Sequence, residues 1–122
     1  MTNVKRIVND LLDNAELTTR QIETFCGYPD TIESFPLVCW YEDGQTELEF
    51  SDNQPNANNC EIEVHIFTKK LSGYLTTNEI ASILYTIFRN ADFVCFNNRE
   101  VADPENEVEH RILNYRKEFL FW

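Results

Sequence analysis

Apolar residues recur every three or four positions at the start of the chain, between Val4 and Leu12. This spacing gathers them on one side of an amphipathic helix. A second, short helix is predicted between Leu17 and Cys26, with Thr18 or Thr19 as its N-cap. The turn-prone residues 27–30 close it.

The strongest helix signal begins at Thr76. Thr76 and Glu79 have the spacing of a capping box, in which each side chain satisfies a free amide of the first turn. Apolar residues then follow at helical spacing from Ile80 to Phe88. We expect this helix to end near Asn90 and to cover one face of a sheet.

The first strand signals lie in the middle of the chain. Phe35 to Tyr41 is rich in aromatic and branched residues and predicts a strand. Residues 42–45 contain Asp-Gly and predict a turn, after which Thr46 to Phe50 returns as the second arm of a hairpin. Residues 51–59 are polar and predict an exposed loop.

The clearest strand runs from Cys60 to Thr68, where apolar and polar residues alternate strictly. One face carries Cys60, Ile62, Val64 and Ile66, and the other carries Glu61, Glu63 and His65. This alternation predicts one buried side and one side that is wet or contacts a partner. Two more strands are predicted over Phe93–Asn97 and Val108–Trp122. Both faces of the last strand become apolar at its end, which predicts a bulge or burial on both sides there.

Taken together, these elements predict a single α+β domain over residues 1–122. Strands joined by hairpin-length connections favour a mostly antiparallel sheet, here of about four to five strands. Two to three helices are expected to pack on one face of that sheet.

Composition narrows the classes of function. Of the 122 residues, 43% are hydrophobic, which is enough for one packed core. The formal charge of −11 argues against nucleic-acid recognition and against docking on an anionic membrane, since both need clustered cations. The charge is uneven, −9 over residues 1–61 and −2 over residues 62–122. The chain also lacks the apolar run of a signal peptide or a membrane span, so we expect a protein that stays where it is made.

Residues suited to catalysis or metal binding are few. The four cysteines stand singly, which predicts free thiols and neither a metal site nor a disulfide framework: Cys26, Cys39, Cys60 and Cys95. The two histidines are His65 and His110, and each is interpreted as a hydrogen-bonding residue of a half-exposed strand. Cys60 and His65 have opposite parity on one strand and point to opposite faces, so they cannot form a catalytic Cys–His pair. A catalytic pair of Cys39 or Cys95 with His110 stays an open alternative. We predict no enzyme activity, no cofactor and no metal.

Two surfaces are candidates for interaction. Glu47 and Glu49 share a strand face, as do Glu61 and Glu63. Such pairs are typical of solvated strand faces, and they would equally form an acidic surface inside an assembly. The chain also ends on bulky apolar residues, which are expected to pack either in the core of the protein or against a neighbouring subunit: Phe119, Phe121 and Trp122.

In their order and in their pattern of apolar and polar residues, these elements resemble those of a known protein family. The resemblance rests on the opening helix, the strand Pro36–Tyr41, the strand Glu61–Thr68, the helix capped at Thr76, and an acidic loop before a final strand that opens with His110-Arg111. The chain is similar to the tail-completion, or tail-terminator, proteins of long-tailed bacteriophages and prophages.

That resemblance implies a structural role without catalytic residues. Copies of the chain would form a ring, typically a hexamer, that caps the tail tube and joins it to the head connector. The implied partners are further copies of the chain, the tail tube protein and the head connector proteins. The implied locations are the cytoplasm of the bacterial host during assembly and then the neck of the virion. We add the hypothesis that the acidic residues face a central channel, where repulsion lets DNA pass without sticking.

Three alternatives remain at this point. One is another phage neck protein, such as a head-closure component that contacts the head. Another is a small cytoplasmic binding module whose polar sheet face holds a partner protein. The last in rank is a hydrolase or transferase that uses His65 or His110.

Overall fold

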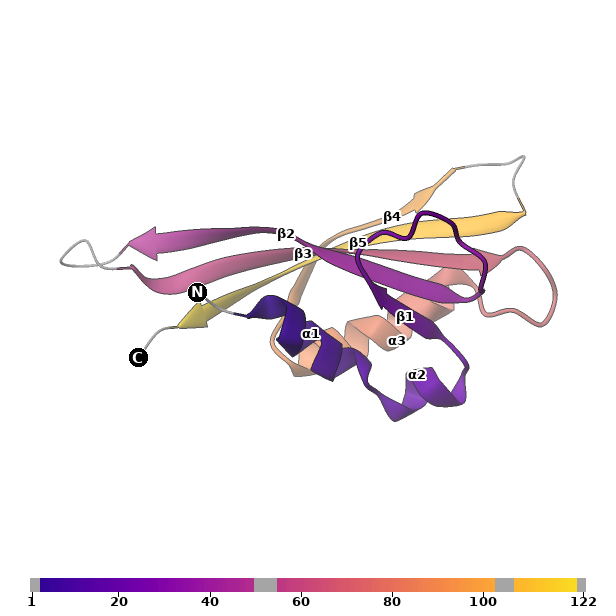
Figure 1. Cartoon of the computed structure of the whole chain (residues 1–122), viewed down its shortest axis with the longest axis horizontal. Coiled ribbons are helices and arrows are strands. Elements are labelled where there is room, and N and C mark those ends of the chain that lie inside the picture. Colours follow the sequence, from indigo (N-terminus) through magenta and orange to yellow (C-terminus); the bar gives the residue numbers. More distant parts are fainter. Residues whose placement is uncertain (1–2, 50–54, 103–106, 121–122) are drawn as a thin grey trace.

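The computed structural model describes residues 3–49, 55–102 and 107–120, with side chains from 45 to 58 and at 120 left out of the description. Within these described residues, three helices and five strands follow one another (Figure 1). Their bounds are α1 Val4–Leu12, α2 Ala15–Thr19, β1 Glu23–Cys26, β2 Leu37–Glu49, β3 Pro55–Lys69, α3 Thr77–Asn90, β4 Val94–Val101 and β5 Val108–Leu120. The predicted α+β class is confirmed.

The first helix has the predicted bounds, whereas the second differs from the prediction. Asn14 caps α2 by accepting from the backbone N–H of Glu16, so neither Thr18 nor Thr19 is its N-cap. The helix is also shorter, and the chain continues as β1, which pairs in parallel with β2. The prediction of helix as far as Cys26 was wrong because pairing with a distant strand, absent from the local pattern, stabilises the extended backbone.

The predicted turn at residues 42–45 is also corrected. β2 continues through it to Glu49, and its register against β3 shifts between Glu42 and Gly44. Asp-Gly therefore forms a bulge inside a long strand, where the extra residue is accommodated without reversing the chain. As a result, the ladder of β2 and β3 extends past the helices (Figure 1).

The capped helix α3 agrees with the sequence prediction. The Thr76 side chain accepts from the backbone N–H of Glu79, and the Glu79 carboxylate accepts from the Thr76 backbone, as a capping box requires. A second carboxylate, from Glu109 on β5, accepts from the backbone N–H of Thr77 at 2.9 Å. This contact fixes the start of α3 against the sheet.

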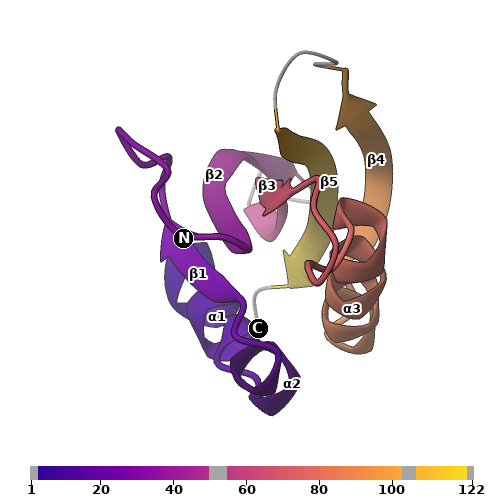
Figure 2. The ribbon, with the colours of Figure 1, turned by 90° about the vertical axis from the view of Figure 1, so that its right-hand side faces the viewer.

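The strands form one curved sheet in the order β1-β2-β3-β5-β4, with β1 and β4 at opposite margins (Figure 2). Only the pair β1·β2 is parallel, and the three other pairs are antiparallel. The helices pack on one side of the sheet, which we call the covered face, and the other side is the open face.

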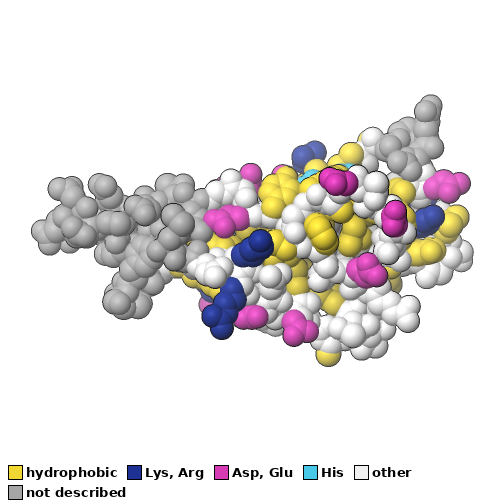
Figure 3. Space-filling view, in the orientation of Figure 1, with side chains coloured by type: hydrophobic (Ala, Val, Ile, Leu, Met, Phe, Trp, Pro, Cys, Tyr) yellow, Lys and Arg dark blue, Asp and Glu magenta, His cyan; other side chains and the backbone are white. Residues whose placement is uncertain are grey.

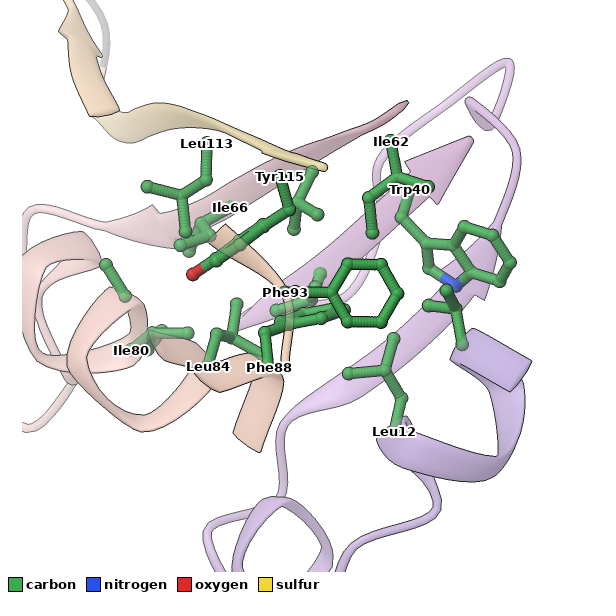
Figure 4. Close-up of a cluster of buried hydrophobic side chains, with 14 of the residues drawn as sticks. Leu12, Trp40, Ile62, Ile66, Ile80, Leu84, Phe88, Phe93, Leu113 and Tyr115 are labelled. Atoms are coloured by element: carbon green, nitrogen blue, oxygen red, sulfur yellow. The ribbon is translucent and has the colours of Figure 1, made fainter. Parts of the chain in front are cut away.

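The alternation predicted for β3 sorts its residues between these two faces. Cys60, Ile62, Val64 and Ile66 lie in the core between sheet and helices, together with Trp40, Leu84 and Phe88 (Figure 4). Rings stack within this core, Phe88 on Tyr115 with centroids 4.4 Å apart. Close packing of large side chains makes the covered face the main source of stability.

In the last strand, two-sided burial is found at its middle, and most of the apolar end for which it was predicted lies outside the described residues. Ile112, Leu113, Asn114 and Tyr115 are all buried. β5 pairs with β3 from Leu120 to Val108 without a register shift, and the bulge of this region lies in β4, between Cys95 and Asn97. Within the described ranges, no helix is long and apolar enough to cross a membrane.

Candidate interaction surface

The open face carries a polar and aromatic cluster centred on His65. Glu63, His65 and Phe67 alternate on β3 with the core residues and therefore project to the open face. The neighbouring strand β5 places His110 opposite Phe67, and their rings stack with centroids 4.2 Å apart. Tyr28, from the segment after β1, closes over the edge of the cluster with its ring 5.2 Å from that of His65.

The two histidines, which we interpreted separately from sequence, are direct partners. His65 Nδ1 lies 2.8 Å from His110 Nε2, and the rings are 5.1 Å apart at 25°. The residues are 45 positions apart in the chain, so no local motif connects them. The sequence could have indicated this contact only if the antiparallel register of β3 with β5 were known, because that register places both histidines on the same face.

Hydrogen-bond chemistry assigns the protons of this pair. Glu63 Oε2 lies 3.1 Å from His65 Nε2, so that nitrogen donates to the carboxylate. In the neutral tautomer with this proton on Nε2, His65 Nδ1 is an acceptor, and His110 Nε2 donates to it. Burial is the main cause that lowers the pKa of His110, and the charges of His65 and Arg99 lower it further, to about 4. The His110 ring is therefore neutral at neutral pH.

The polar cluster extends across the open face to the edge of the sheet. Asn114 Nδ2 donates to Glu63 Oε1 at 3.4 Å, and Asn97 Nδ2 on β4 donates to Asn114 Oδ1 at 2.8 Å. The hydroxyl of Tyr41 is 3.5 Å from His65 Nε2. Each of these polar side chains thus has a partner inside the protein, as a structural network requires.

This cluster holds no activated nucleophile. Cys39 lies opposite His65 in the ladder and is fully buried. Burial raises its pKa to about 11, so it is a thiol at neutral pH, and burial raises the pKa of Cys60 to about 11 as well. In the part of the chain that the structure describes, no group of three or more His, Cys, Asp or Glu side chains is placed to hold a metal ion.

The predicted acidic surface is only partly described. Glu61 and Glu63 are half-buried on β3, and Glu63 is engaged by His65 and Asn114. Glu47 and Glu49 belong to β2, and their side chains lie outside the described residues. Among the described side chains, acidic groups are spread singly over the face seen in Figure 3.

Of the three C-terminal aromatic residues, only Phe119 is described. It packs against the core, edge-on to Phe93 at 6.2 Å, with the Lys117 ammonium 4.9 Å from its ring centre. This position corresponds to the first of the two expectations, packing in the core of the protein. Phe121 and Trp122 lie outside the described residues.

Exposed apolar side chains mark both margins of the sheet. Phe25 on β1 is 46% exposed and lines a shallow groove of about 220 Å³ together with Leu37. Val94 and Phe96 on β4 are 54% and 44% exposed. Sequence reasoning missed both patches because β1 was read as helix and because the bulge at Phe96 has no local signature.

No protein-family model matches the chain, and a search of curated proteins finds no match either.

Proposed function

We propose that this protein is a structural subunit of the tail-completion type, which assembles with copies of itself into a ring at the head-proximal end of a phage tail. The ring joins the tail to the head connector. The sequence resemblance supplies the family, and the α+β sheet with helices on one face agrees with the architecture that the resemblance implies.

The observation that carries this proposal is the way the sheet ends. In the described residues β1 pairs only with β2, and β4 only with β5, so both margins offer free strand edges. Exposed apolar side chains accompany both edges, together with charged residues and, on β4, a bulge, which are features that limit association in monomeric proteins. An open sheet of this kind is suited to continuation by neighbouring subunits.

The polar cluster on the open face supports a structural role in a different way. Each of its polar side chains has a hydrogen-bond partner within the protein, its nearby cysteine is a buried thiol, and His110 stays neutral. These features favour a stabilising network over catalysis, which places the hydrolase or transferase alternative behind the structural one.

The test is negative-stain imaging of the purified protein, alone and mixed with tail tubes assembled without it. Rings, or a new cap on one end of each tube, would support the proposal. Leu71→Ser, on an exposed connection distant from both margins, is the matched control and should cap tubes as the wild type does. Bare tubes and particles of monomer size would favour a head-side neck protein, and binding to purified head connectors would then identify it.

The channel hypothesis is tested by charge reversal in the same particles. Glu47, Glu49 and Glu61 are changed together to Lys, and DNA passage is followed through infectivity. Glu63 is left out of this set because its reversal would disrupt the hydrogen bonds to His65 and Asn114. Slower passage is expected because cations bind phosphates, and unchanged infectivity would contradict the hypothesis.

A further inference from the structure

The directions of the two edge strands determine how one sheet can continue into another. β1 is parallel to β2, and each of the three following steps across the sheet is antiparallel. β4 therefore runs opposite to β1. If the sheet of one copy continues into the next, β4 and the neighbour's β1 meet as an antiparallel pair, the arrangement with the better-aligned hydrogen bonds.

The outer edge of β1 has backbone groups available for such a pair. Glu23 N–H donates to Pro36 O, and Gly27 N–H donates to Trp40 O, so the odd positions of this strand face β2. Successive peptide groups in a strand point to opposite sides, and those of Thr24 and Cys26 therefore point away from the sheet. An exposed strand edge of this kind is a template for pairing with another strand.

Side chains beside β1 form an acidic, apolar groove on the open face. Phe25 pairs in register with Cys39, which places it on that face, and Pro29 and Leu37 complete the apolar part. Glu23 and Glu33 line the same groove and are exposed. The groove thus combines an aromatic surface with negative charge.

Side chains beside β4 have the complementary character. Phe96, at the bulge, lies under the guanidinium of Arg116, 5.4 Å from its ring centre, and Val94 is exposed next to it. Arg99 adds a second exposed cation, on β4 itself, whereas Arg116 belongs to the neighbouring strand β5. An apolar patch with two arginines therefore lies beside β4, and the acidic groove lies beside β1. Figure 2 shows these two strands at opposite margins of the sheet.

We propose that β4 of one copy pairs antiparallel with β1 of the next copy, and that the Phe96–Arg116 patch packs on the groove lined by Phe25 and Glu23. This inference rests on the proposed function and names the interface that builds the ring. The two margins differ, so the contact is heterologous: each copy has one free edge of each kind, and assembly ends only when a ring closes. Charge complementarity between arginines and glutamates selects this pairing over contact between two like edges.

Charge reversal at each margin tests the pairing. Arg116→Glu and Glu23→Arg should each weaken self-association roughly 10- to 100-fold, because like charges then face each other. The measurement is sedimentation velocity of the full chain between about 1 μM and about 1 mM, a span that reaches contacts of only a few kcal/mol. Glu118→Arg, an exposed reversal on β5, is the matched control and should assemble as the wild type does.

Mixing the two single variants distinguishes a heterologous contact from a symmetric one. Arg116→Glu retains a native β1 edge, and Glu23→Arg retains a native β4 edge. Their mixture should assemble again, because the native β4 edge of Glu23→Arg meets the native β1 edge of Arg116→Glu, and the two altered edges also carry opposite charges. A mixture that assembles no better than either variant alone, while the wild type forms rings, would overturn the inference.

The backbone part of the interface has its own test. Thr24→Pro removes an N–H that points away from β2, whereas Thr24→Val keeps it and preserves the shape of the side chain. Thr24→Pro should abolish assembly while thermal unfolding shows that the monomer is folded, and Thr24→Val should assemble normally. Equal assembly of the two variants would contradict strand pairing at this edge.

Capping of tail tubes by the variants and by the wild type shows whether this inference or the proposed function has failed. If Arg116→Glu and Glu23→Arg cap tubes as well as the wild type does, the interface is wrong and the proposed function stands. If the wild type neither forms oligomers up to about 1 mM nor caps tubes, both are overturned.

Discussion

The two faces of the sheet are built from the same strands and stabilised by different means. On β3, Ile62, Val64 and Ile66 enter a large apolar core under the helices, while Glu63 and His65 enter a hydrogen-bonded network on the open face. The open face has an apolar cluster of its own, but its buried members are only Leu37, Cys39 and Phe67. The covered face thus provides most of the burial energy, and the open face provides specific polar contacts whose net contribution per bond is small.

Truncating one leucine on each face measures this difference directly. Leu84→Ala, in the fully buried core, should lower the free energy of unfolding by about 3–4 kcal/mol, since it removes burial and leaves a cavity. Leu37→Ala, in the small open-face cluster, should cost about 2 kcal/mol. Leu71→Ala, at an exposed position, is the control and should change stability by less than about 0.5 kcal/mol. Equal losses at Leu84 and Leu37, measured by urea denaturation, would contradict the comparison.

The joint between α3 and the sheet gives the next largest effect. Glu109 accepts from the backbone N–H and the hydroxyl of Thr77 at the positive end of the helix dipole, and Arg111 Nε donates to the same hydroxyl at 3.1 Å. Glu109→Ala should therefore cost about 2 kcal/mol. Glu107→Ala, two residues earlier and exposed, should be nearly neutral. Thermal unfolding of the two variants side by side checks the prediction, and similar melting temperatures would refute it.

On the open face, the neutral His110 gives stability a specific pH dependence. Its pKa is lowered from 6.5 to about 4, so the unfolded chain takes up this proton as the pH falls through 6.5, while the folded protein does so only near pH 4. Stability from this group is complete above pH 6.5 and is lost between pH 6.5 and 4. The loss should be about 1–2 kcal/mol after allowance for solvent screening, and it belongs to the coupled His65–His110 pair.

The matched variant His110→Gln keeps an amide donor for His65 and removes the titrating group. Urea denaturation from pH 7 to pH 4 should show a smaller loss for this variant than for the wild type. The carboxylates titrate in both proteins, so the difference between the two curves isolates the histidine. Parallel curves would show that the open-face network does not carry this pH dependence.

The sequence predicted those parts of the covered face whose signals are local. Helical spacing identified α1, the capping box identified α3, and strict alternation identified both faces of β3. Each of these signals depends on neighbours within a few positions, where backbone periodicity alone decides which side chains share a face. They were therefore readable without knowledge of the partner strands.

The margins and the open face could not be predicted in the same way. β1 is extended because it pairs with β2, and Asp43-Gly44 is a bulge because β2 continues along β3, although both segments favour other structures locally. The contact between His65 and His110 likewise exists only through the register of β3 with β5. Interactions between distant segments set these features, and a single sequence carries their register only weakly.

The smallest effect concerns a polar atom on the covered face. Among the described side chains, the hydroxyl of Tyr115 is buried without a hydrogen-bond partner, and burial raises its pKa. Its ring stacks on Phe88, so Tyr115→Phe keeps the packing and removes only the unsatisfied group. We expect the variant to be more stable by about 0.5–1 kcal/mol, which calorimetry of wild type and variant can resolve. By contrast, Tyr41→Phe on the open face removes a hydroxyl near His65 Nε2 and should give no gain. A gain at Tyr41 as large as that at Tyr115 would mean that the polar groups of the open face are no better satisfied than the one in the core.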